Sequence, residues 1–211
     1  MYELIILSLL MRFPLNRYQL AKIVDEKLGP YAKLSNGTLY PLLAKLEETG
    51  LVAVPKQGES GKRRDRHSRL FHITDAGRLR FGQLMMDTSS FLADYQQAFQ
   101  FKVASLDLLP VAKRLYLLNH YITYCQAHVL HFTTGAETLA QELAALPEAS
   151  PPFQDRALAA IRHLVEQWEA EAAWAMQLRE EERLRAEAAS TEEISGKSRE
   201  AAAGSRLPCI P

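Results

Sequence analysis

The segment from Ser35 to Glu47 places small, hydroxyl and cationic side chains where one face of a helix would gather them. Leucines recur there with spacing i, i+3, i+4 and i+7, which predicts a helix with a buried stripe. The stripe consists of Leu39, Leu42, Leu43 and Leu46. Helical geometry turns outward Gly37, Thr38, Tyr40, Pro41, Ala44 and Lys45. Such a mixed surface suits the major groove of DNA.

The polar groups on this face could bind phosphates and base edges. Ser35 is a natural N-cap, and the hydroxyls of Ser35 and Thr38 can donate to phosphate oxygens near the positive helix end. Gly37 lets the backbone approach a phosphate, Tyr40 can reach a phosphate or a base edge, and Lys45 adds charge. In the alternative interpretation, Ser35 and Thr38 only cap the helix and Tyr40 packs on a hairpin.

A basic cluster follows, between two predicted strands. Alternation at Val52–Val54 and Phe71–Ile73, with turn residues at Gly58–Gly61, predicts a two-stranded hairpin. Near its tip lie Lys56, Lys62, Arg63, Arg64, Arg66 and Arg69. A basic wing would straddle the phosphate backbone or enter the minor groove. The alternative is a solvated charge run on a loop.

Charge is divided unevenly along the chain, although the formal total is zero. Residues 1–80 contain 14 Lys and Arg against 8 Asp and Glu, and residues 81–211 contain 11 against 17. This asymmetry indicates an anion-binding module joined to a part with another role. Two distant cysteines, Cys125 and Cys209, make no disulfide framework and are typical of a reducing cytoplasm. The apolar run Leu4–Met11 is too short for a membrane span, and we interpret it as a buried first helix.

Helical patterns occupy most of the remaining sequence. Thr74 predicts the N-cap of a helix whose apolar spacing continues to Tyr95. A 4-3 apolar repeat runs from Val111 to Leu146, and a second long amphipathic helix follows the prolines that break it. Beyond about Ala188 the sequence has no apolar period, which predicts a disordered tail.

Three motifs together resemble the PadR family of winged-helix transcriptional regulators. They are Tyr18-Gln19-Leu20, Ser35-Asn36-Gly37-Thr38-Leu39-Tyr40-Pro41-Leu42-Leu43 and Phe71-His72-Ile73-Thr74-Asp75-Ala76-Gly77. The sequence departs from the common pattern at Asn16-Arg17, where His-Gly is frequent, and at Ser68 and Leu70, where a basic residue and a tyrosine are usual. Arg17 could add a phosphate contact.

The resemblance implies binding to double-stranded DNA through the predicted helix and the basic wing. The residues predicted to contact DNA are Arg17, Tyr18, Ser35, Asn36, Gly37, Thr38, Tyr40, Lys45, Lys62, Arg63, Arg64, Arg66 and Arg69.

The C-terminal half, about Phe99–Glu182, resembles the PadR branch related to virulence-gene activators, with Trp174 at a matching position of the late helix. This implies a homodimer formed by exchange of the last helices, which brings two winged domains to a pseudopalindromic site. The residues predicted to form the dimer contact are Ile161, Leu164, Val165, Trp168, Ala172 and Trp174.

The fold expected from these patterns is mostly α. It comprises an N-terminal winged helix-turn-helix DNA-binding domain with a small β-hairpin wing at residues 1–80 and a helical C-terminal dimerisation and effector domain at 81–187. A disordered tail is expected at 188–211.

The C-terminal half also contains residue types that can form an effector pocket or a metal site. Aromatic residues there could line a pocket for a small aromatic effector, since some members of the family sense phenolic compounds or drugs, although a dimer core is the simpler interpretation. These residues are Tyr116, Tyr121, Tyr124, Trp168 and Trp174. Helical rotation spreads Cys125, His128 and His131 over different faces, so we expect no metal and no cofactor. The sequence contains no phosphate loop, nucleophile elbow or paired-carboxylate pattern, so we expect no enzyme.

Our main hypothesis is a cytoplasmic homodimeric repressor whose DNA affinity changes with an effector. One alternative is a helical dimeric protein-interaction module that has lost specific operator binding. A third hypothesis is a small-molecule-binding or metal-responsive protein in which the winged domain is secondary.

Overall fold

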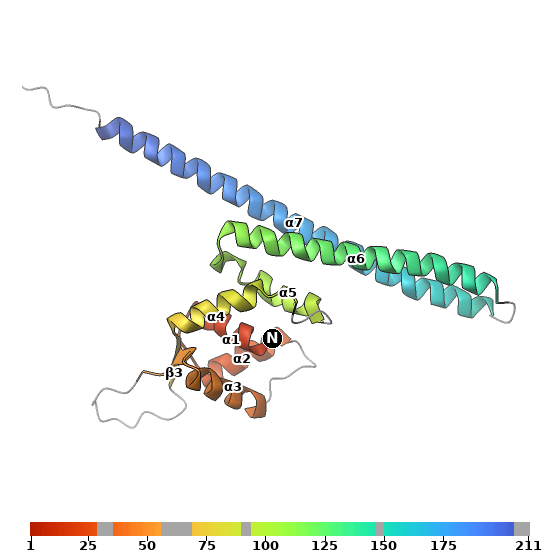
Figure 1. Ribbon diagram of the computed structural model, residues 1–211, viewed down its shortest axis with the longest axis horizontal. Helices are drawn as coiled ribbons and strands as arrows, with labels where there is room; N and C mark the ends of the chain where they lie inside the picture. Colours follow the sequence, from red (N-terminus) through yellow and green to blue (C-terminus); the bar gives the residue numbers. More distant parts are fainter. Residues whose placement is uncertain (29–35, 56–68, 90–93, 147–149, 205–211) are drawn as a thin grey trace, which may run out of the picture. The chain divides into compact units, whose positions relative to one another are not determined.

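The computed structural model describes residues 1–28, 36–55, 69–89, 94–146 and 150–204, and helices dominate it (Figure 1). The chain forms two compact units, Met1–Leu108 and Leu109–Pro211. The first unit thus continues past residue 80, where the sequence placed the end of the N-terminal domain. Within the described residues, no helix combines the length and apolarity needed to cross a membrane.

The first unit is built around a buried first helix. Its helices are α1 (Tyr2–Leu10), α2 (Arg17–Leu28), α3 (Asn36–Glu48), α4 (Asp75–Met86), α5 (Tyr95–Val103) and the short 3-10 helix η3 (Leu106–Leu108). Residues 5–7 of α1 are at most 1% exposed, as the apolar run predicts. Two salt bridges fasten later elements to this end of the chain: Arg80 to Glu3 at 2.8 Å and Arg12 to Asp107 at 2.7 Å.

Three short strands form an antiparallel sheet in the order β1-β3-β2. They are β1 (Leu15–Asn16), β2 (Val52–Ala53) and β3 (Leu70–Ile73). Val52 pairs with Ile73, which confirms the predicted hairpin, and Leu15 pairs with Phe71. The sequence did not predict β1, because a two-residue strand is too short to show alternation.

Hydrogen bonds connect the backbone after α3 with the start of α4. Gly50 has a left-handed backbone (φ 71°) and ends α3, with the Leu51 amide donating to the Leu46 carbonyl at 2.9 Å. The Thr74 hydroxyl accepts from the Gly77 amide at 3.1 Å, which confirms the predicted N-cap. The same hydroxyl lies 2.6 Å from the Gly50 carbonyl oxygen and 3.0 Å from that of Leu51.

The helix that the apolar spacing extended to Tyr95 ends earlier, at Met86, and this corrects the prediction. The backbone of Asp87 is extended, and its side-chain Oδ1 accepts a hydrogen bond from the Ser89 amide at 3.0 Å. The Asp87 carbonyl also accepts a hydrogen bond from Nζ of Lys102 on α5. These polar contacts end α4 although the apolar period continues.

The second unit is an antiparallel hairpin of α6 (Val111–Ala144) and α7 (Pro151–Gly204), which lie side by side (Figure 1). Its seam follows the predicted repeat in the first half of α6, with Leu118, Ile122 and Cys125 at most 5% exposed. The two ends of the predicted repeat are not buried, since Val111 is 36% and Leu146 54% exposed. Helix α7 includes residues 188–204, where the sequence predicted a disordered tail. The prediction was wrong for a physical reason: many of these residues are Ala, Glu, Lys or Arg, which favour a helix without needing an apolar period.

Candidate nucleic-acid interface

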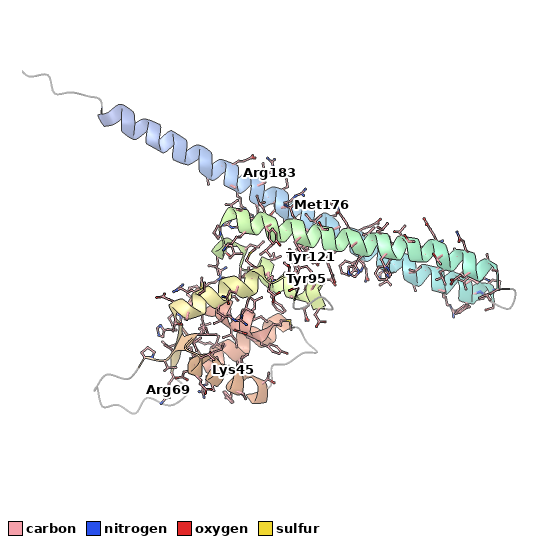
Figure 2. All side chains as sticks on the ribbon, in the orientation of Figure 1. Lys45, Arg69, Tyr95, Tyr121, Met176 and Arg183 are labelled. Atoms are coloured by element: carbon pink, nitrogen blue, oxygen red, sulfur yellow. The ribbon has the colours of Figure 1, made fainter. Side chains whose placement is uncertain are left out.

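Helix α3 is divided lengthwise into a buried and an exposed face, as predicted. Leu39, Leu43 and Leu46 are at most 2% exposed. The residues predicted to face outward are all exposed: Gly37, Thr38, Tyr40, Pro41, Ala44 and Lys45. The face therefore presents small and hydroxyl-bearing residues at its start and a cation near its end; Figure 2 labels that cation, Lys45.

Part of the predicted interface falls outside the described residues. This part comprises Ser35, Lys62, Arg63, Arg64 and Arg66. Asn36 begins α3, but its side chain is also outside what the structure describes. Arg69 is exposed directly before β3 (Figure 2). Arg69 is therefore the cation of the predicted wing whose position the structure describes.

A reciprocal hydrogen-bond pair fixes the start of α2. The Gln19 amide donates to Asn16 Oδ1 at 2.9 Å, and the Asn16 amide donates to Gln19 Oε1 at 3.0 Å. This is a capping box, which satisfies two backbone donors at a helix start. Its signature, Asn followed three residues later by Gln, is a sequence signal that can predict this helix start. Tyr18 lies between the two residues of this capping box, and its side chain is 72% exposed.

Arg17 of α2 contacts the outward face of α3 and strand β3. Its guanidinium carbon lies 5.3 Å from the ring centre of Tyr40 on α3 and 5.7 Å from that of Phe71 on β3. Its Nε is buried and has no hydrogen-bond partner among the residues that the structure describes. The structure thus brings together two residues predicted separately, Arg17 and Tyr40, and adds Phe71, for which no interface role was predicted.

Helical rotation places most of the predicted dimerisation residues on one face of α7, namely Ile161, Leu164, Val165, Trp168 and Ala172, with Trp174 on another face. Ala172 is 6% exposed, and the ring of Trp168 stacks on that of His128 with centres 4.0 Å apart. Trp168 also meets Tyr124 edge-on at 5.6 Å, so it packs on α6 of its own chain. Leu164 is 37% exposed. Ile161, Val165 and Trp174 are partly buried.

A polar pair lies within the α6–α7 seam. The Tyr121 hydroxyl donates to Glu171 Oε1 at 2.5 Å, and burial together with this bond raises the pKa of Tyr121 far above its usual range. Burial, with Glu171 adding to it, raises the pKa of the Cys125 thiol to about 11. Burial lowers the pKa of His128, with a smaller effect of His131. Within the described part of the chain, no group of three or more His, Cys, Asp or Glu could hold a metal ion.

Three solved structures are similar to this chain at low identity. Bacillus subtilis PadR in complex with operator DNA is 18% identical, with 85% of this chain and 98% of that chain covered and a TM-score of 0.36. The same protein in complex with p-coumaric acid is 17% identical, with 86% and 98% covered and a TM-score of 0.36. The Vibrio cholerae virulence activator AphA is 17% identical, with 88% and 99% covered and a TM-score of 0.34. No curated protein matches the chain.

The family assignment rests on the N-terminal part of the sequence. Residues 6–83 match the sequence model of the transcriptional regulator PadR-like family. The matched range includes part of α1, all of α2 and α3, the three strands and most of α4. It also contains the motifs that carried the resemblance. The N-terminal part of this chain is therefore a domain of the PadR-like family of transcriptional regulators.

Proposed function

We propose that this chain is a homodimeric transcription regulator that binds operator DNA through α3 and the β2–β3 wing. The observation that carries the proposal is the lengthwise division of α3 within a PadR-like domain. The leucines attach the helix to the core, and the described residues of the opposite face are exposed to solvent. A helix of this kind fits the major groove, which is about 12 Å wide.

The exposed face contains the groups that DNA binding requires. Gly37 and Thr38 lie in the first turn of α3, where the helix dipole favours a phosphate. Tyr40 and Lys45 extend the surface along the helix, toward base edges and a further phosphate. The proposed interface also includes Arg17, Tyr18, Ser35, Asn36, Lys62, Arg63, Arg64, Arg66 and Arg69.

The second unit is proposed to hold two copies together. A groove of about 400 Å³ on the α6–α7 hairpin contains apolar side chains such as Ala136, Leu158 and Val165 beside the charged Arg162 and Glu166. A helix of a second copy would bury these apolar groups and pair with the charges. A dimer matches a pseudopalindromic operator.

The finer parts of the proposal concern regulation. We place the protein in the cytoplasm as a repressor, with operator occupancy blocking transcription. A small aromatic effector would act through the aromatic residues of the second unit, of which Tyr116 is 53% exposed. Quenching of tryptophan fluorescence by a planar phenolic acid, reversed by operator DNA, would support this part.

The central experiment compares binding to a duplex from the chain's own upstream region with binding to a scrambled duplex at several salt concentrations. Tyr40→Ala should lower the preference for the specific duplex about 5- to 100-fold. Lys45→Ala should weaken binding to both duplexes and reduce the salt slope by about 1. Lys113→Ala, on an exposed position of α6, is the matched control and should change neither. Equal affinity of the native protein for both duplexes would refute operator binding and favour a protein-interaction module.

A further inference from the structure

Arg17 occupies an unusual place for a cation beside a proposed DNA surface. Its guanidinium lies against two aromatic rings, those of Tyr40 and Phe71, rather than in open solvent. A buried donor without a partner destabilises a fold, and within the described part of the chain Nε of Arg17 is such a donor. The attraction between a cation and ring faces offsets this cost only while both rings keep their positions.

The two rings belong to elements of different rigidity. Phe71 is 1% exposed and lies in β3, the central strand of the sheet, where it pairs with Leu15. Tyr40 is 42% exposed on the outward face of α3. The capping box of Asn16 and Gln19 fixes the backbone on both sides of Arg17. The guanidinium therefore packs against the buried ring of Phe71 and also against the exposed ring of Tyr40.

An exposed tyrosine on a helix can adopt more than one rotamer, and binding must select one. A planar guanidinium held against the ring makes that selection before the ligand arrives. We propose that Arg17 is a positioning residue, which holds the Tyr40 side chain against the sheet so that its hydroxyl meets DNA in one orientation. The proposal rests on the proposed function, and it assigns Arg17 a part in sequence discrimination rather than in charge neutralisation.

The test measures binding of the full-length variants to the upstream and scrambled duplexes at several salt concentrations. Arg17→Ala should reduce the preference for the specific duplex on the order of 3- to 10-fold, the range expected for ordering one side chain. The salt slope should stay unchanged. Arg17→Lys should lose a similar part of the preference, because an ammonium keeps the charge but lacks the planar group that stacks on rings. In a Tyr40→Ala background, Arg17→Ala should cause no further loss.

A direct phosphate contact predicts a different pattern. Arg17→Ala would then weaken binding to both duplexes equally, lower the salt slope by about 1 and retain its effect in the Tyr40→Ala background. Arg17→Lys would largely restore binding. This pattern would overturn the proposal while leaving operator binding by the protein intact.

A measurement without DNA separates the positioning role from the proposed function. Nuclear magnetic resonance of the unbound protein should show the Arg17 Nε–H proton shifted upfield by the two rings and the Tyr40 side chain in one χ1 rotamer. Arg17→Ala should leave the Tyr40 rotamer averaged, with an unchanged thermal unfolding midpoint as the control. Averaged Tyr40 rotamers in the native protein would overturn the proposal. If the native protein shows no preference between the duplexes, the proposed function fails. The positioning role of Arg17 is still supported if Tyr40 keeps one rotamer in the native protein and loses it in Arg17→Ala.

Discussion

The α-carbon of Gly77 lies so close to the carbonyl of Leu51 that a Cβ at position 77 would stand 2.1 Å from that oxygen. The same Cβ would lie 2.8 Å from the Ile73 side chain. Helix α4 can therefore approach the connection after α3 only if residue 77 has no side chain. This contact and the Thr74 hydroxyl tie the backbone that follows α3 to the start of α4.

Gly77→Ala should destabilise the protein by about 1–3 kcal/mol or more, because the new methyl group forces the backbone of α4 away from Leu51. Urea unfolding followed by circular dichroism measures the change. Gly82→Ala is the matched control in the same helix, since its Cβ would meet nothing within 4 Å. That variant should be neutral or more stable by up to about 1 kcal/mol, as expected for alanine in a helix. Equal losses for the two variants would contradict the close approach at Gly77.

Tyr121→Phe should cost about 1–3 kcal/mol of unfolding free energy, because the Glu171 carboxylate loses a hydrogen-bond donor inside the helical hairpin. Tyr116→Phe removes the same hydroxyl from a side chain that is 53% exposed, and it should change stability by less than about 0.5 kcal/mol. Thermal and urea unfolding of both variants provide the comparison. A Tyr121→Phe variant as stable as the native protein would show that the hydroxyl bond contributes nothing to the seam.

The buried side chain of Lys102 should make the stability of the protein depend on pH. Burial lowers the pKa of Lys102 from 10.5 to about 8, with Asp87 acting in the opposite direction. Between about pH 8 and 10.5 the unfolded chain therefore binds more protons at this group than the folded chain, so the contribution of Lys102 to stability rises with pH there. The slope is at most about 1.4 kcal/mol per pH unit.

The comparison of native protein with Lys102→Met isolates this effect from other titrating groups. The difference in unfolding free energy, native minus variant, should become more favourable to the native protein as pH rises from 7 to about 10. Lys113→Met, at an exposed position, should give a difference that stays flat over the same range. A flat difference for Lys102→Met would mean that the amine is solvated in the folded protein.

Leu164→Glu should weaken self-association if the α6–α7 hairpin forms the dimer. Leu164 is 37% exposed on α7, so a charge there leaves the hairpin folded but opposes burial against a second copy. Analytical ultracentrifugation over a range of concentrations should show at least a 10-fold weaker dimer, which corresponds to about 1.4 kcal/mol. His163→Glu, at the neighbouring exposed position, is the control. A monomeric native protein would refute the dimer itself.

The sequence predicted elements whose signal is local and repeated. The leucine stripe of α3, the apolar repeat of α6 and the Thr74 cap each depend on residues within one or two helical turns. The end of α4 was missed because it depends on Lys102, which reaches back to the Asp87 carbonyl from the next helix. An apolar period cannot reveal such a contact.

The contacts of the candidate interface show the same limit. Arg17 and Tyr40 were each predicted as DNA contacts from motif and face, but their mutual contact depends on how α2, α3 and β3 pack. The stacking of Trp168 on His128 likewise depends on the register between α6 and α7. A repeating apolar pattern shows which face of each helix is buried. It does not show how far one helix is shifted along the other.

The division of α3 has a consequence for how such a protein can evolve. Its buried face and its Gly50 end fix the helix in place through leucine side chains and backbone atoms. Tyr40 contacts Arg17, but substitutions at other exposed sites of such a face usually change stability by less than about 0.5 kcal/mol. Mutations can therefore accumulate on the outward face without loss of the fold. A duplicated copy of the gene could drift toward a new target sequence while its product remains a folded domain at every step.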